Sequence, residues 1–280
     1  MTSARRFYHK CLDSNNEWKS KGGPIYFVIQ NIRRYGPFPI IDGRMKEEQS
    51  PNLARLFAYF NKNATIIPAL VPRITYDERS PSQVNLAFQN EQSSFPTEKS
   101  ESDLKLLTDL VWQVCIDTHS PCEENAVRAD LSDVYDFMKN LKKMISLPGM
   151  TWRVTLRNLD EQMEAVNWTD YLHEVSPPDV IQYIVPDIEI VTPSAKAMKG
   201  IHSLLKNTTG RTITNSVMVM YILSWAELLD ENYRSIVDSF VRQRVLSPSP
   251  TREDLCLSRA WNTFSHAMIA MHAQLNNERV

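Results

Sequence analysis

The chain has 280 residues, of which 42% are hydrophobic, and 31 basic against 33 acidic residues give a formal net charge of −2. This length allows one large domain or two ordinary ones, with enough apolar residues for a sizeable core. The balanced charge argues against a nucleic-acid surface, which needs a clustered basic excess. With only 7 Gly and as many as 11 Met, the composition favours long helices over a turn-rich β fold.

The N-terminal part of the chain is predicted to be helical. The spacing predicts a helix over residues 5–18, ended by Gly22-Gly23. Pro24 suits the first turn of a second helix. A third helix is predicted over residues 52–61, where apolar residues recur at helical spacing.

The period then changes from helical spacing to partial alternation. Residues 69–76 and 84–88 are rich in Val, Ile and other strand-forming types. They flank a polar stretch at 77–82, and this pattern predicts a β-hairpin. Residues 91–102 are polar and without periodicity, which is typical of a loop.

From Asp103 onward the helical spacing returns. Residues 217–223 form the longest apolar run, which is too short and too interrupted to span a bilayer and is predicted to be a buried core helix. Residues 179–191 have a strand-like spacing. The other periodic segments after Asp103 are predicted to be helices. The predicted helices are one starting at Asp103, one capped by Thr155, and those at 131–144, 168–175, 193–206, 212–230, 232–245 and 251–276. No internal repeat or boundary is visible, so residues 1–280 are expected to form a single domain.

Two features of the sequence point to different compartments. Residues 1–6 carry charge but no apolar h-region, so they are not a signal peptide, and no membrane anchor is visible. The four cysteines either form disulfides, with three possible connectivities, or remain free thiols. Three glycosylation sequons, at Asn63, Asn167 and Asn207, add weak support for an oxidising compartment.

Several short segments follow one another in a distinctive order. They are Tyr8-x-x-Cys11, Gly22-Gly23-Pro24, Tyr35-Gly36-x-Phe38-Pro39, Val134-Tyr135-Asp136-Phe137-Met138, Asn167-Trp168-Thr169-Asp170-Tyr171-Leu172, Tyr221-Ile222-Leu223, and Cys256 with its helix. This order and spacing resembles the N-terminal, largely helical domain of the neprilysin and endothelin-converting-enzyme family of zinc metalloendopeptidases. The resemblance covers almost the whole chain.

The resemblance implies a fold and a cysteine pairing. The expected fold is mainly α, a multi-helix neprilysin-like N-terminal (lid) domain with a small β-hairpin. The implied disulfides are Cys11–Cys256 and Cys115–Cys122; four buried free thiols are the alternative. The chain departs from the family pattern on either side of the shorter pair, at residues 89–103 and 123–130.

The family's chemistry is absent from this sequence. In the family, an H-E-x-x-H helix in a C-terminal domain supplies two zinc ligands and a general base. This chain has no H-E-x-x-H, and no two of its histidines are four residues apart. The histidines are His9, His119, His173, His202, His266 and His272. We therefore expect no catalytic, cofactor-binding or metal-binding residue here, and zinc only in full-length family members.

Three hypotheses about function follow. In the first, the chain is the non-catalytic lid of a neprilysin-like peptidase, inactive alone, which limits the access of peptides to the zinc site. Its partners would be the missing catalytic domain or a full-length relative, and peptides, in an extracellular or plasma-membrane ectodomain. The alternative is a free-standing peptide- or protein-binding module. An unrelated cytosolic helical scaffold is the third and predicts four reduced thiols. A lid without its catalytic domain should expose an apolar face.

Overall fold

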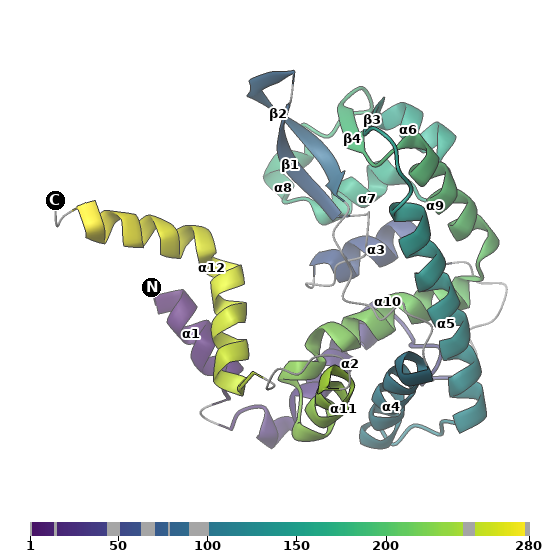
Figure 1. Ribbon diagram of the computed structural model, residues 1–280, viewed down its shortest axis with the longest axis vertical. Coiled ribbons are helices and arrows are strands. Elements are labelled where there is room, and N and C mark those ends of the chain that lie inside the picture. Colours follow the sequence, from purple (N-terminus) through teal and green to yellow (C-terminus); the bar gives the residue numbers. More distant parts are fainter. Residues whose placement is uncertain are drawn as a thin grey trace. The chain divides into compact units, whose positions relative to one another are not determined.

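A computed structural model describes residues 2–13, 16–43, 51–62, 71–77, 79–89, 101–242 and 250–277. Helices dominate these ranges, and their strands form one four-stranded sheet (Figure 1). The predicted mainly-α class with a small hairpin is confirmed. The chain groups into two compact units: unit 1 comprises residues 1–31 and 225–280, and unit 2 comprises residues 32–224.

Two helices, α2 and α10, carry the chain from one unit to the other. Unit 1 contains α1 (Thr2–Cys11), the short helices η1 (Lys19–Lys21) and η2 (Ala226–Leu228), α11 (Glu231–Arg242) and α12 (Arg252–Asn277). The crossing helices are α2 (Pro24–Tyr35) and α10 (Gly210–Trp225). Unit 2 contains α3 (Leu53–Lys62), β1 (Val71–Asp77), β2 (Ser80–Gln89), α4 (Glu101–Asp117), α5 (Glu124–Ile145), β3 (Trp152–Thr155), α6 (Leu156–Gln162), α7 (Trp168–Val175), α8 (Pro178–Ile181), β4 (Glu189–Thr192) and α9 (Ala195–Asn207).

In unit 1 the two ends of the chain are held together. Helix α1 packs along α12 (Figure 1), where the rings of Phe7 and Phe264 meet edge to face at 5.7 Å. Cys11 and Cys256 form a disulfide between the same two helices. Arg252 donates a hydrogen bond of 3.0 Å to the main-chain oxygen of Cys11. Covalent, aromatic and polar contacts therefore act on one helix pair.

The first helix is shorter than predicted. It ends at Cys11 rather than near Trp18. Asp13 takes a left-handed conformation with φ 51°, and its carboxylate accepts hydrogen bonds from the N–H groups of Trp18 and Lys19 at 3.1 and 3.4 Å. An aspartate that bonds to the following backbone favours a turn over a continuing helix.

Unit 2 is built around helix α10. Its residues from Ile213 to Ile222 are buried, which confirms the predicted core helix. The ring of Tyr221 meets Phe60 of α3 at 5.2 Å. Near the start of α10, Arg211 donates two hydrogen bonds to the carboxylate of Asp130 in α5, at 2.9 and 2.6 Å.

Among the described residues, no single helix is long and apolar enough to cross a membrane. One bent pair, Gly210–Leu228 with Glu231–Phe240, meets the length and composition requirements only when its two parts are taken together.

The sheet has the strand order β1-β2-β4-β3. Strands β1 and β2 form the predicted antiparallel hairpin. Strand β4 pairs in parallel with β2 and antiparallel with β3, and neither β3 nor the parallel pair was predicted. The prediction of extended structure over residues 179–191 was wrong for most of that stretch. Pro178 starts the short helix α8, and strand β4 begins only at Glu189. Proline at the first helical position favours that helix start.

Most other predicted helices are confirmed, with shifts at their ends. The helix expected from Asp103 begins at Glu101, and the helix expected from residue 131 begins at Glu124. Thr155 caps α6 as predicted, because its side chain accepts a hydrogen bond from the N–H of Asn158. The predicted loop at residues 91–100 and the sequon at Asn63 lie outside the described residues.

Candidate functional site

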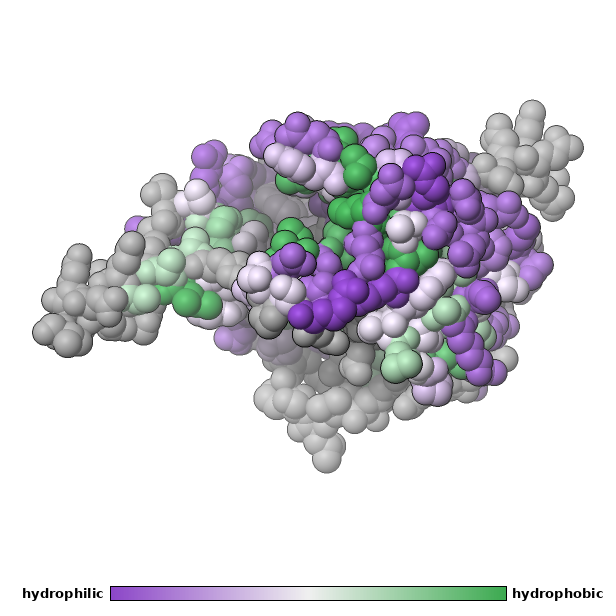
Figure 2. Space-filling model, turned by 90° about the horizontal axis from the view of Figure 1, so that it is seen from above, coloured by the Kyte–Doolittle hydropathy of each residue, from purple (hydrophilic) through white to green (hydrophobic). Residues whose placement is uncertain are grey.

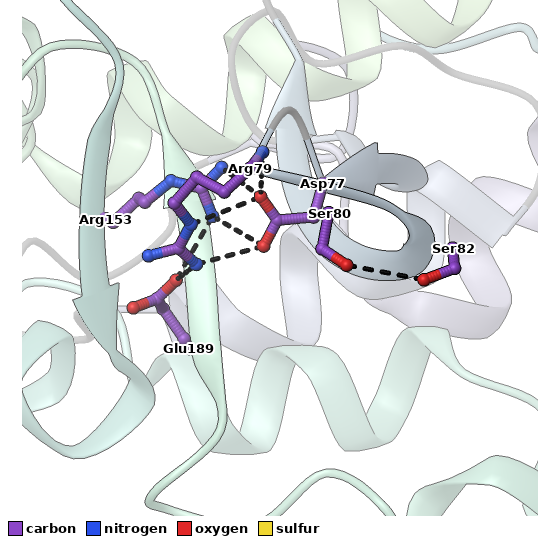
Figure 3. A network of polar contacts seen from close by, with 6 residues as sticks. All are labelled: Asp77, Arg79, Ser80, Ser82, Arg153 and Glu189. Atoms are coloured by element: carbon purple, nitrogen blue, oxygen red, sulfur yellow. Dashed lines mark hydrogen bonds and ion pairs between the residues drawn. The ribbon is translucent and has the colours of Figure 1, made fainter.

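Four charged side chains meet at one end of the sheet (Figure 3). Asp77 ends β1, Arg79 lies in the hairpin turn, and Arg153 and Glu189 come from β3 and β4. Arg79 donates to the Asp77 carboxylate at 3.2 and 2.9 Å and to Glu189 at 2.7 Å. Arg153 donates to Asp77 at 3.1 Å and to Glu189 at 3.1 Å. Each guanidinium thus bridges both carboxylates.

Local and distant parts of the sequence build this cluster. The main-chain N–H of Arg79 donates to the Asp77 carboxylate at 2.8 Å, which shapes the hairpin turn. Arg153 and Glu189 reach the cluster because β3 and β4 pair beside the hairpin. Sequence analysis missed the cluster, since only the spacing Asp77-x-Arg79 is local and Arg153 lies 76 residues from Asp77.

The cluster is suited to holding the sheet together rather than to catalysis. Hydrogen bonds from Arg79, and then from Asn85, together with the charge of Arg153, hold the pKa of Asp77 well below its usual range. A general acid or base works best with a pKa near the operating pH. Asp77 is almost fully buried and remains ionised at neutral pH, so it fixes the hairpin turn to β3 and β4.

We expect Asp77→Asn to lower the melting temperature at neutral pH and to remove part of the acid sensitivity. Because the folded-state pKa of Asp77 is lowered, its contribution to stability is complete above the unfolded pKa, near 3.9, and is lost as the pH falls toward the folded pKa. The difference in melting temperature between wild type and variant should therefore shrink below about pH 4. Thermal melts between pH 3 and 7 measure this, and a constant difference would contradict the assignment.

The four cysteines form two disulfides, each inside one unit. Cys11 is bonded to Cys256 in unit 1, and Cys115 to Cys122 in unit 2. Their sequence separations are 245 and 7 residues. This is the pairing that the family resemblance implies, and disulfides are typical of proteins in oxidising compartments.

The two described sequon asparagines are exposed. Asn167 caps α7, because its side-chain oxygen accepts a hydrogen bond of 2.8 Å from the N–H of Asp170. Asn207 donates from its amide nitrogen to the main-chain oxygen of Ser203 at 2.9 Å. Both residues therefore lie at the surface of the fold.

A sequence profile of peptidase family M13 matches residues 2–276. The chain belongs to peptidase family M13. Neprilysin-1 of Caenorhabditis elegans is 19% identical over an alignment of 295 residues, and the alignment covers 96% of this chain and 38% of that relative.

Two solved structures share the fold of this chain. Two structures of the Mycobacterium tuberculosis zinc metalloprotease Zmp1, one in an open state and one with an inhibitor, match with TM-scores of 0.69 and 0.68. Their sequence identities are 12% and 13%, and the match covers 96% of this chain but 41% and 40% of theirs. The M13 chain therefore spans about two-fifths of the length of these relatives.

Membership of M13 implies zinc, but the described residues do not fit a zinc site. Within those ranges, no group of three or more His, Cys, Asp or Glu side chains could hold a metal ion. Two of the histidines bind main chain instead: His173 lies 2.9 Å from the oxygen of Ile184, and His202 accepts from the N–H of Ala165 at 3.4 Å. We therefore derive no catalytic step for this M13 chain.

A groove beside α4 encloses about 440 Å³. Its lining side chains are mostly polar and belong to α4 and to the start of α5. They are Glu101, Ser102, Leu104, Lys105, Thr108, Asp109, Glu124 and Arg128. Lys105 and Asp109 are already paired with each other, and acidic side chains in a first helical turn are stabilised there by the helix dipole. The groove carries no catalytic constellation.

Large hydrophobic side chains are exposed in both units of the M13 chain, and the face viewed in Figure 2 shows hydrophobic residues among hydrophilic ones. Three of them lie on the hairpin, three in or just after α8, and three along α12. These are Ile74, Tyr76 and Val84; Val180, Tyr183 and Val185; and Leu257, Trp261 and Ile269, and the others are Tyr26, Phe27, Ile116 and Met150. Exposed apolar patches of a few hundred Å² mark interaction sites.

Proposed function

We propose that this M13 chain covers the zinc centre of a peptidase and limits which peptides reach it. Residues 1–280 act together as one N-terminal domain. Zinc and the general base come from the remaining part of an M13 protein, which this chain does not match. By itself the chain hydrolyses nothing. Its role is steric selection.

The observation that carries this proposal is the course of the chain. The described residues between 32 and 224 form one compact unit, which the chain enters through α2 and leaves through α10. The two flanking ends are joined by the Cys11–Cys256 disulfide. The compactness of unit 2 suits it to act as a single cover.

The exposed hydrophobic surfaces support a second candidate, a free-standing binding module. A chain of this kind would bind peptides or a full-length relative through the apolar side chains of the hairpin or of α12. For either role we propose an extracellular or plasma-membrane ectodomain, with carbohydrate at Asn167 and Asn207, which the two disulfides support.

A chimera tests the access role. This chain replaces the matching part of Neprilysin-1, and cleavage of a ten-residue peptide is compared with cleavage of an unfolded protein of about 100 residues. We expect the chimera to cleave the peptide and to discriminate strongly against the protein, because the cover excludes bulky chains. Equal specificity constants for the two substrates would contradict the proposal.

A further inference from the structure

We infer that strand β1 binds an extended peptide as an additional, antiparallel strand of the sheet, with alternate apolar residues of the peptide packed on Ile74 and Tyr76. The inference rests on the proposed function only for the class of ligand, a peptide. The hairpin itself supplies the evidence, from the register of its strands, the exposure of one face and the open edge of β1.

One face of the hairpin changes from buried to exposed along its length. Residues opposite each other in an antiparallel pair share a face, so Phe88, Leu86 and Val84 of β2 lie on the same face as Pro72, Ile74 and Tyr76 of β1, in that order. Phe88 is buried against the rings of Trp168 and Tyr171 in α7. Farther along, Ile74 and Tyr76 are each 75% exposed and Val84 is 60% exposed. The turn end of the hairpin extends beyond the helices of unit 2 (Figure 1).

The main chain of β1 is open on the same stretch. Within the described ranges, β1 has a neighbouring strand on one side only. Pro72 lies opposite Phe88 and has no N–H to donate. It therefore suits a non-hydrogen-bonded pair, in which the two residues do not bond to each other through their main chains. Because such pairs alternate with bonded ones, Ile74 and Tyr76 turn their N–H and C=O groups to the open edge. Within the described part of the chain, the two residues that expose apolar side chains therefore also direct main-chain groups to the open edge.

The ends of this stretch are protected and its middle is not. Proteins blunt open edges with prolines, bulges and charges. Pro72 lies at one end of the stretch, and an irregularity in the ladder between Tyr76 and Asp77 lies at the other. Beyond it, Asp77 is held by Arg79 and Arg153. The open segment is thus short and fixed in place, which limits what it accepts to a few residues of extended chain.

The size of the apolar surface also indicates a short peptide. The exposed parts of Ile74, Tyr76 and Val84 amount to on the order of 400 Å², about half of the ~800 Å² per partner in a stable interface between folded proteins. A second copy of this chain would need more surface than the face provides. A peptide strand needs less, because main-chain hydrogen bonds supply part of its affinity and alternate side chains supply its specificity.

The probe is a fluorescein-labelled peptide, Lys-Thr-Val-Thr-Val-Thr-Lys, with blocked ends. In an antiparallel pair, the residues opposite Ile74 and Tyr76 bond through their own N–H groups, and here they are the valines. Methylating the two valine amides should weaken binding to the full chain by about tenfold or more, because two hydrogen bonds are lost. Methylating two threonine amides should leave the affinity within about twofold, since those groups point away.

Variants of the chain test the same contacts from the other side. Ile74→Pro removes one outward N–H without removing a bond to β2, and Tyr76→Thr removes apolar contact; each should weaken binding of the probe several-fold. Met150→Thr changes a side chain that is 91% exposed outside the sheet and is the matched control. Fluorescence anisotropy gives the affinities, and exchange of the Ile74 and Tyr76 amides should slow only when the probe is bound.

Two results would overturn the inference. One is an equal loss of affinity for the two methylated peptides, or no binding of the unmethylated probe at millimolar concentration. The other is protection of the Ile74 and Tyr76 amides in the chain alone at micromolar concentration, which would make a second copy the occupant. The assay measures binding and not cleavage, so its failure would leave the proposed access role standing.

Discussion

Replacing both Cys11 and Cys256 by alanine should lower the free energy of unfolding by up to about 5 kcal/mol. The disulfide closes a loop with a sequence separation of 245 residues, and the loss of chain entropy on closing a loop grows with its length. The effect should concentrate in unit 1, where α1 and α12 would then be held only by contacts such as the Phe7–Phe264 pair. Hydrogen exchange with mass spectrometry, resolved by segment, measures the loss in each unit separately.

The matched control is the double substitution of Cys115 and Cys122 by alanine. That bridge closes a loop with a separation of only 7 residues, so its loss should cost about 2 kcal/mol and affect unit 2. If removal of the short bridge destabilised the chain as much as removal of the long one, the long bridge would not be the main constraint on the unfolded state.

Substituting Phe88 by alanine should cost about 3–5 kcal/mol, the usual loss for a buried phenylalanine. Phe88 is 4% exposed, and its ring lies 5.3 Å from that of Trp168 and 6.1 Å from that of Tyr171. Only two residue pairs join β2 to β4, so these aromatic contacts hold the base of the hairpin on α7. Urea unfolding of the full chain measures the loss.

Tyr76→Ala is the control on the same face of the same hairpin. Because Tyr76 is 75% exposed, its loss should change stability by no more than about 0.5 kcal/mol. Comparable losses for the two variants would mean that the register, and with it the division of this face into buried and open parts, is wrong.

The helices could be predicted because their signals are local. In α9, the N-cap Ser194 and the buried positions Ala197, Met198 and Ile201 lie within two turns of one another, so spacing alone identifies the helix. The hairpin was predicted for the same reason, since its two strands are adjacent in sequence. The end of α1 was predicted too far along the chain, because the turn that ends the helix depends on how the Asp13 side chain bonds to the backbone.

The rest of the sheet depends on contacts between distant segments. The parallel pairing of β2 and β4 joins Leu86 to Ile190, and no local pattern specifies that neighbour. The charged cluster has the same origin, since Arg153 meets Asp77 and Glu189 only after three separate segments have paired. The open face at Ile74 was beyond sequence analysis as well, because alternation alone does not show which part of a strand the helices cover.

The most direct test of the access role compares the chimera with a version from which unit 2, residues 32–224, has been removed and replaced by a short Gly/Ser linker. The quantity is the ratio of specificity constants for the unfolded protein and the ten-residue peptide, measured in preparations that still bind an active-site inhibitor. We predict that this ratio rises at least tenfold when unit 2 is removed, because the cover no longer excludes long chains. An unchanged ratio would contradict it.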